Sequence, residues 1–360
     1  MSNKTWGRMT MALTIFLLVL IGGFVILIDP FFHYHKPLKS LEYKLHSEWY
    51  QNDGIARNFK YNAVLTGTSM IEMTNTSELD DLFGTKSVKI PYGGGSYYQI
   101  DSLVKQAADS NSKLKIVIRG LDFNRLVTDS VDAVRGDVPF PEYLYNDNPF
   151  DDVKYIFNKS VILNEAMYTI LYTENGYKTT SFDEYARWEG DYQYGLTEEM
   201  INNHLQAPKK EMLPIDEKEY KKIKENIRVN VIETAKANPD IDFYYFIPPY
   251  SVYAYDYYNR EGELEKFLEY HKRAMAMMLE VPNIKLYSFM DLYDVIENPD
   301  NYRDEYHYGE WVNSTLLQCL NDGEHRVTKD NFKSYCKKID NYYLNYDYAA
   351  LFEDQYLASR

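Results

Sequence analysis

The sequence predicts an α/β fold: a doubly wound, five-stranded parallel sheet with a helical insertion and one N-terminal transmembrane helix. Short apolar segments that end in Gly or Pro alternate with segments whose apolar residues recur every three or four positions. This alternation breaks between residues 124 and 215, and a 20-residue stretch near the N-terminus carries no charge. Strand–helix alternation is typical of a parallel sheet with helices on both faces.

The composition is that of a globular protein and excludes several classes. The 360 residues are 45% hydrophobic and 26% charged, which rules out a fibrous or largely disordered chain. The net charge is −15, and because residues 1–45 carry +3, the remainder carries −18. Such an acidic body repels phosphate backbones, so we expect no nucleic-acid partner. Two cysteines exclude a disulfide-rich scaffold and a multi-cysteine zinc site, and the sequence predicts no cofactor and no metal.

The uncharged stretch near the N-terminus is Met9–Ile28. At about 1.5 Å per residue, a helix of this length spans about 30 Å, the thickness of one hydrocarbon core. A cleaved signal peptide is the alternative interpretation. However, the stretch ends at Asp29-Pro30 without the small residues of a cleavage site, which favours an uncleaved anchor.

The orientation of this anchor depends on the lengths of its two sides. Basic residues precede and follow it, so the positive-inside rule is nearly balanced. A short head of residues 1–8 and a long acidic body predict a cytoplasmic head, an anchor over residues 9–28 and an extracytoplasmic body in a single-pass cell-membrane protein. Residues 29–59 then form a juxtamembrane segment, whose Phe31, Phe32 and Tyr34 we expect to lie as an aromatic belt at the membrane interface.

The strands and helices of the body follow from its periodicity. The expected strands are Ala63–Thr66, Ser87–Ile90, Leu114–Ile118, Asp242–Ile247 and Ile284–Tyr287. The expected helices are Tyr97–Ser110, Asp216–Ala237, Glu261–Leu279 and Asn331–Tyr343. Asp216 with Glu219 three residues on is the pattern of a capping box. Residues 60–123 and 216–321 thus form the α/β domain, and residues 322–360 form a helical tail.

Residues 124–215 are too long for a simple loop. They are rich in Tyr, Asn and Asp and include a helical pattern over residues 157–171. We expect a mostly helical insertion that lies over the carboxyl ends of the strands as a lid or acceptor groove, because ligands bind at that edge of such sheets.

A candidate nucleophile follows the first expected strand. Gly67 permits a tight turn where the strand ends, and Ser69 comes two residues later, where the next helix would begin. The amino end of that helix would supply N–H donors for an oxyanion. A serine at such a position is also a common structural N-cap, so the motif alone is weak.

A candidate base and its carboxylate follow the last expected strand. A serine nucleophile needs an imidazole base, and the imidazole needs a carboxylate to select its tautomer. Asp304 and His307 are three residues apart, so one loop can present both side chains to one place. A turn aspartate beside a surface histidine is the alternative.

The order of these motifs strengthens the enzyme interpretation. In a doubly wound sheet, Ser69 and the Asp304/His307 pair lie at the same carboxyl edge. The second strand ends in the glycine cluster 93–95, and the third leads into Gly120-Leu121-Asp122-Phe123-Asn124 at that edge.

These four blocks, in this order, resemble the SGNH/GDSL hydrolase superfamily, whose sheet is flavodoxin-like. The blocks that carry the likeness are Gly67-Thr68-Ser69, Gly94 or Gly95, and Asp304 with His307. The likeness covers about residues 60–125 and 240–320. With the anchor, the chain is similar to envelope acyl-transfer proteins, such as the D-alanyl transfer protein of the teichoic-acid pathway and polysaccharide O-acetylation proteins. Trp311, after the Asp304/His307 pair, adds to the first likeness.

The resemblance implies a catalytic triad of Ser69, His307 and Asp304. It also implies an oxyanion hole that includes Gly94 or Gly95, and a membrane-bound O-acyltransferase as partner. Two positions depart from the superfamily pattern. Thr68 replaces the usual Asp, and Asp122 stands where an Asn should donate a hydrogen bond. Asn124, two residues on, is the candidate replacement for that donor.

The remaining candidates are weaker. We expect Cys319 in the core, and a bridge to Cys336 stays open. His204, His271 and His325 have no partners at metal-ligand spacing, and we expect them at the surface.

The sequence therefore predicts a serine acyltransferase or esterase acting outside the cytoplasm. Its substrate would be the acyl or acetyl groups of a cell-envelope polysaccharide or teichoic acid. The alternative is a catalytically weak module that binds glycan within an envelope-assembly complex. The Tyr-rich insertion and Asp122 favour that alternative, and the complete Ser/His/Asp set opposes it.

Overall fold

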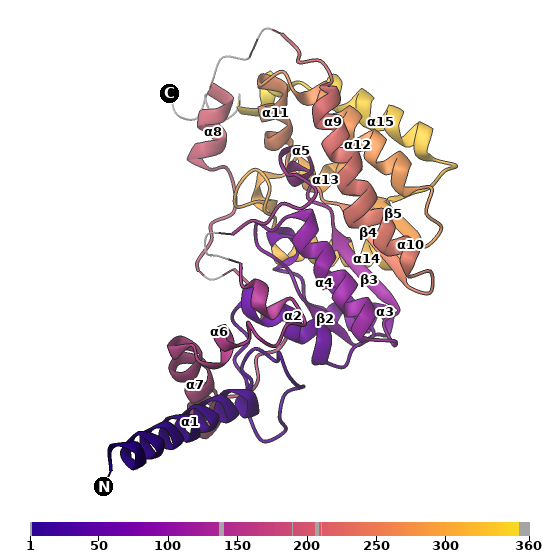
Figure 1. Cartoon of the computed structure of the whole chain (residues 1–360). Coiled ribbons are helices and arrows are strands. Elements are labelled where there is room, and N and C mark those ends of the chain that lie inside the picture. The colour runs from indigo at the N-terminus through magenta and orange to yellow at the C-terminus, as the bar shows by residue number, and fades with distance from the viewer. Residues whose placement is uncertain (1, 137–139, 189, 206–208, 210, 353–360) are drawn as a thin grey trace.

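The computed structural model describes residues 2–136, 140–188, 190–205, 209 and 211–352. It is a mixed α/β structure in which helices flank one sheet (Figure 1). The strands are β1 Ala63–Thr66, β2 Ser87–Lys89, β3 Ile116–Gly120, β4 Asp242–Ile247, β5 Ile284–Ser288 and β6 Arg326–Val327. Their order is β2-β1-β3-β4-β5-β6, and β1 to β5 are parallel.

The sheet confirms the predicted α/β class but has one strand more than the five expected. The first five strands follow the order 2-1-3-4-5, which is the flavodoxin-like arrangement. The sixth, β6, pairs antiparallel with β5 through Val327 and Arg326. Two residues show no periodicity, so only their pairing with a distant strand identifies them as a strand.

The helices come from segments with an apolar stripe and, between the strands, cover both faces of the sheet. The first eight are α1 Asn3–Ile28, α2 Glu48–Asn58, α3 Thr76–Phe83, α4 Tyr97–Ser110, α5 Asn124–Thr128, α6 Val153–Ile156, α7 Met167–Glu174 and α8 Glu198–Leu205. The others are α9 Glu217–Ile227, α10 Glu233–Ala237, α11 Val252–Arg260, α12 Leu264–Met278, α13 Tyr293–Ile296, α14 Glu310–Asp322 and α15 Phe332–Leu344. Short turns of helix include η1 Ser69–Ile71, η3 Val161–Ala166 and η4 Arg228–Ile232.

Two predicted helices differ in detail. The helix expected over Asp216–Ala237 is interrupted by the π-turn η4 between α9 and α10. Asp216 does cap α9, because its carboxylate accepts the Lys218 N–H at 2.7 Å. The predicted capping box is wrong, since the Glu219 carboxylate accepts the Tyr270 hydroxyl at 3.0 Å instead of returning to the backbone.

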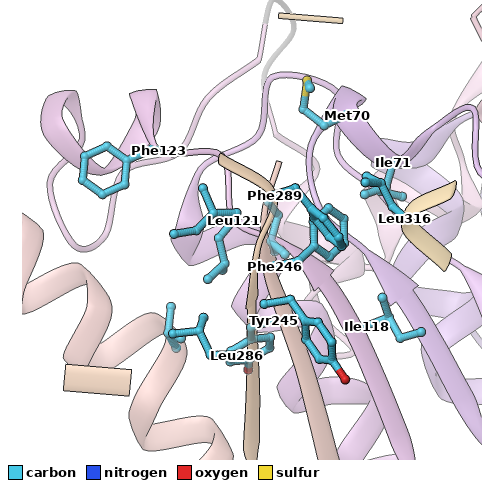
Figure 2. Close-up of a cluster of buried hydrophobic side chains, with 14 of the residues drawn as sticks. Met70, Ile71, Ile118, Leu121, Phe123, Tyr245, Phe246, Leu286, Phe289 and Leu316 are labelled. Carbon is cyan, nitrogen blue, oxygen red and sulfur yellow. The ribbon is translucent and has the colours of Figure 1, made fainter. Parts of the chain in front are cut away.

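The core lies between the sheet and its helices. Figure 2 shows Phe246 of β4, Phe289 and Leu316 of α14 close to Ile71 of η1. Ile71 is fully buried, and it follows Ser69 by two residues. Packing in this cluster therefore fixes the backbone that carries the candidate nucleophile.

The helix α1 is long and apolar enough to cross a membrane. It extends away from the sheet (Figure 1). The expected aromatic belt after it is wrong for the two phenylalanines: Phe31 and Phe32 are 4% and 1% exposed and pack inside the protein. Phe31 stacks on Tyr155, with ring centroids 5.4 Å apart, and Phe32 joins the main core.

The segment 124–215 divides into parts with different positions. Residues 153–174 pack along the second half of α1 (Figure 1), so they do not lie over the carboxyl ends of the strands as expected. Trp188, Tyr192 and Tyr194, in contrast, reach the Asp304/His307 loop and the residues beside it. Turns and extended stretches make up most of the described segment, so it is less helical than predicted. The Tyr and Asn content of the segment does not predict which part lies beside α1 and which part lies at the Asp304/His307 loop. Contacts with distant elements determine both positions.

Candidate active site

The structure brings Ser69, His307 and Asp304 together at the carboxyl edge of the sheet. The Ser69 hydroxyl lies 2.8 Å from His307 Nε2. The other ring nitrogen, Nδ1, lies 2.8 Å and 2.9 Å from the two carboxylate oxygens of Asp304. Each side chain is partly exposed, with 23% for His307 and 30% for Asp304, so a substrate can reach the group.

The turn after β1 presents Ser69 because Gly67 adopts a backbone that few other residues tolerate. Its φ is +150°, and a Cβ there would lie 3.3 Å from the backbone of Gly120. Thr68 then caps the short helix η1, in which Ser69 is the first residue. Ser69 therefore begins only a single helical turn, and not the next helix as predicted, since α3 begins at Thr76. One helical turn has little macrodipole, so any oxyanion stabilisation must come from individual N–H groups.

Asp304 holds its own loop as well as the imidazole. Its Oδ1 atom accepts the backbone N–H groups of Tyr306 at 2.9 Å and His307 at 2.8 Å. Burial alone would raise the pKa of Asp304, but the hydrogen bond and charge of His307 and these two N–H groups together lower it below its usual value. The carboxylate therefore stays ionised and keeps the Nδ1–H tautomer of His307.

Residues 91–95, called here the glycine loop, carry the two glycines predicted as oxyanion donors, and the two differ in their hydrogen bonds. The Gly95 N–H donates to the Tyr92 carbonyl at 2.9 Å, so it is already used. Gly94 has a φ of +65°, and its N–H has no hydrogen-bond acceptor among the described residues. The Ser69 N–H is likewise unbonded within the described part of the chain. The geometry thus favours Gly94 and Ser69 over Gly95 as donors.

The Asp122 side chain acts as an acceptor and not as the donor expected of an Asn at this position. Its two carboxylate oxygens accept the Thr68 hydroxyl, at 3.2 Å, and the Tyr250 hydroxyl. The carboxylate therefore braces the turn that carries Ser69. Asn124 begins α5, but its side chain lies outside the described residues.

Sequence reasoning missed the contribution of α2 to the site. Its Glu48 carboxylate accepts the Gly93 N–H at 2.7 Å, and Trp49 stacks on Tyr92 with centroids 4.8 Å apart. Asn52 donates to the Pro91 carbonyl. Three successive contacts hold the glycine loop, although α2 lies in the segment expected to be only juxtamembrane. The sequence has no signal for this, because residues 48 and 93 meet only in the folded chain.

Replacing Glu48 with leucine should therefore slow the reaction at Ser69. The loop would lose the acceptor for the Gly93 N–H, and a lost buried hydrogen bond costs about 1–3 kcal/mol. We expect the labelling rate with a serine-directed fluorophosphonate to fall about tenfold, which is about 1.4 kcal/mol. The matched control is Glu48→Gln, which keeps an oxygen acceptor and should remain within about twofold of wild type. Equal rates in both variants would contradict the role of this hydrogen bond.

A second carboxylate, Glu72, lies buried behind the same loop. Its Oε1 atom lies 2.8 Å from the place where a Cβ on Gly93 would stand. Burial raises the pKa of Glu72, and the negative charge of Glu48 raises it further. The buried Lys89 ammonium donates to the backbone carbonyl of Glu72 at 2.7 Å, and burial lowers the pKa of Lys89.

The raised pKa of Glu72 predicts a stability that falls with pH. Near pH 4.5, its ordinary value, the unfolded carboxyl begins to lose its proton while the folded one keeps it. Stability therefore decreases from there until the pH passes the folded pKa. We expect Glu72→Gln to gain stability relative to wild type by about 1–2 kcal/mol between pH 5 and pH 8, in urea titrations. Glu217→Gln on the exposed side of α9 is the control; a pH-independent difference for Glu72→Gln would contradict the prediction.

Aromatic residues of the insertion form one wall of the site. Trp188 lies edge-on to His307, with centroids 5.2 Å apart, and the Arg303 guanidinium stacks on Trp188 at 3.7 Å and on Tyr192 at 4.3 Å. Further out, Tyr194 packs against Trp311, which is 47% exposed. These contacts position His307 and leave an aromatic edge facing solvent. The Tyr content of the insertion indicated such a surface but not which residues form it.

The remaining candidates have structural surroundings. Both cysteines are free, and Cys319 is buried as expected. The expected surface position is wrong for His271, which is 1% exposed, stacks on Phe123 and has a pKa lowered to about 3 by burial. His325 pairs with Asp291 at 2.6 Å. Among the described residues, no cluster of three or more His, Cys, Asp or Glu side chains could hold a metal ion.

Comparisons with known proteins assign no family. No family model matches the chain, and no curated protein matches it. The solved structures include one provisionally described as a platelet activating factor from Streptococcus pneumoniae. It is 11% identical, with a TM-score of 0.39, over 77% of this chain and 90% of that one. A similarity this low carries neither the fold nor the function.

Proposed function

We propose that the chain is a serine acyltransferase or esterase of the SGNH type. The carrying observation is the continuous relay from the Ser69 hydroxyl through His307 to Asp304. A hydroxyl bonded to an imidazole, which is itself bonded to a carboxylate, is an activated nucleophile for acyl transfer. The N-terminal helix and the exposed aromatic edge support a location at the membrane and a glycan or teichoic-acid acceptor.

The first half-reaction forms an acyl-serine. His307 Nε2 takes the Ser69 proton while the oxygen attacks the acyl carbonyl carbon. The N–H groups of Ser69 and Gly94 hold the oxyanion of the tetrahedral intermediate. The intermediate collapses, the bond to the donor alcohol breaks, and that alcohol leaves with the proton from Nε2. Asp304 stabilises the imidazolium between these two transfers.

The second half-reaction decides between transferase and esterase. An acceptor hydroxyl gives its proton to Nε2 and attacks the acyl-serine, or water does the same. The Ser69 oxygen then leaves and recovers the proton. With an envelope glycan as acceptor, the donor would be a membrane-bound O-acyltransferase that delivers acyl groups across the bilayer.

Mass analysis of the intact chain and of its peptides after incubation with p-nitrophenyl acetate tests this proposal. An acetyl group on the Ser69 peptide, released faster when an envelope oligosaccharide is present than in water alone, would establish transfer. Release at the same rate in both would establish an esterase. A chain that binds the oligosaccharide but forms no acetyl adduct would instead be the glycan-binding module, which the exposed Trp311 and the absent Asn at position 122 favour.

A further inference from the structure

The helical segment 153–174 has an exposed apolar face beside α1. We propose that this segment, called here the platform, lies at the boundary between the headgroups and the hydrocarbon of a lipid bilayer, on the side of the body, as a second membrane contact of the chain. The inference rests on α1 being the membrane anchor and is independent of the chemistry at Ser69.

The platform is attached to the last two turns of α1. Gly22 has no side chain, and a Cβ there would lie 3.2 Å from Ile156 Cγ2. Val25 is fully buried in a cluster that includes Tyr155 and Val161. The Tyr155 hydroxyl donates to the Asp29 carboxylate at 2.9 Å, which ties the platform to the end of the helix.

This attachment places the platform at membrane depth. Gly22 precedes Ile28, the last residue of the apolar run, by six residues, or about 9 Å along the helix axis. If the hydrocarbon core ends near Ile28, Ile156 lies about 9 Å inside that boundary. Interfacial helices bury their apolar faces about 5–10 Å into the same layer.

The outward face of the platform is apolar. Leu163, Met167 and Leu171 are 51%, 44% and 50% exposed and follow one another at intervals of four residues along one helix face. Val153 and Phe157 extend the exposed apolar surface toward α1, at 52% and 43%. Five large apolar side chains exposed on one short segment are unfavourable in water and indicate a partner of low polarity.

The charges around this face fit lipid headgroups. Six lysines of the platform and the neighbouring segments are exposed: Lys36, Lys39, Lys44, Lys154, Lys159 and Lys178. Three acidic residues of the same region, Asp29, Asp53 and Asp152, are buried, whereas Glu142, Asp147 and Glu174 are exposed. In a chain of net charge −15, the six exposed lysines here outnumber the three exposed acidic residues, and such lysines attract anionic lipids by about 1 kcal/mol per residue. Tyr168 and Tyr177, 39% and 56% exposed, are of the type that occupies membrane interfaces.

A bilayer accounts for these features once a single assumption is made, that α1 is inserted in the membrane. Once α1 is inserted, a segment attached to its outer turns is already at lipid depth, whereas a protein partner would need a separate complementary surface. Two contacts, unlike one helix, would fix the tilt of the body above the membrane.

Spin labels on the full chain in nanodiscs containing phosphatidylglycerol test the proposal. In a Cys319→Ser/Cys336→Ser background, labels replace Leu163 or Leu171, with Ile21 of α1, at the level of Gly22, as lipid reference and Glu217 of α9 as water reference. We expect Leu163 and Leu171 to match Ile21, with high collision rates with oxygen and low rates with a nickel chelate. Labels that match Glu217 would overturn the proposal. So would labels protected from both reagents, which would indicate a protein contact.

A matched pair of glycine variants tests the attachment. Gly22→Leu forces a side chain against Ile156, so the Leu163 label should become at least threefold more accessible to the nickel chelate. The neighbouring Gly23 has nothing within 4 Å of an added Cβ, so Gly23→Leu should leave the label unchanged. Equal effects of the two variants would overturn the claim that α1 sets the depth of the platform. Fluorophosphonate labelling of Ser69 in the same nanodiscs reads the proposed chemistry separately.

Discussion

Replacing Ser69 with alanine is expected to abolish labelling by a serine-directed fluorophosphonate. The probe reacts with a hydroxyl only when a base removes its proton, and the Ser69 hydroxyl lies 2.8 Å from His307 Nε2. Loss of that base should also be large, since positioned proton transfer contributes about a hundred- to ten-thousand-fold in rate. We therefore expect His307→Ala to label at least about a hundredfold more slowly than wild type.

The fold offers a matched control for the histidine. His325 also pairs with an aspartate, Asp291, at 2.6 Å, but it lies beside β6. His325→Ala removes the same chemistry and should leave the labelling rate unchanged. Equal labelling of wild type and Ser69→Ala, or no labelling of either, would contradict the enzyme interpretation and favour the glycan-binding module.

Asp304→Asn is expected to produce the second-largest effect, a loss of about a thousand- to ten-thousand-fold. The backbone N–H groups of Tyr306 and His307 both donate to Oδ1, so the amide oxygen of an asparagine must take that position. Its NH₂ group then replaces Oδ2, which lies 2.8 Å from His307 Nδ1. Two donors cannot face each other at this shorter contact, and Oδ1, 2.9 Å from Nδ1, already accepts two backbone N–H groups. The imidazole would therefore favour a proton on Nε2, where it can no longer accept one from Ser69.

The labelling rate and the ¹⁵N shifts of His307 measure this change together. We expect the proton to move from Nδ1 to Nε2. Asp291→Asn, in the other His–Asp pair, is the control and should leave the rate as in wild type. Because the pKa of Asp304 is lowered, its contribution to stability is present above about pH 3.8 and is lost as the pH falls toward the folded pKa. A rapid reaction in Asp304→Asn would contradict the assigned tautomer.

Local patterns were sufficient for much of the fold. The five parallel strands and the helix Tyr97–Ser110 were predictable because each has its own periodicity and its own Gly, Pro or capping residue. Ser69, Asp304 and His307 were predictable as candidates because parallel strands bring their carboxyl ends to one edge. Gly67 marked the turn because few other residues adopt its backbone angles.

Other features depended on contacts between residues far apart in the chain. The support of the glycine loop by Glu48, the packing of Trp188 against His307 and the burial of His271 have no local signature. The pairing of β6 with β5 and the division of segment 124–215 between α1 and the site likewise depend on contacts between distant residues.

By itself, the sequence thus determined the α/β class, the apolar N-terminal helix and the residue types that could form a relay. Hydrophobic periodicity and turn chemistry act over a few neighbouring residues, so they can be read without the fold. Only the tertiary structure decided that Ser69 reaches His307 and that, among the described residues, the Gly95 N–H has an acceptor and the Gly94 N–H has none. It also decided that Asp122 accepts from Thr68. Whether a hydrogen bond forms depends on differences of a few tenths of an ångström in the distance between donor and acceptor, and packing of the whole chain sets that distance.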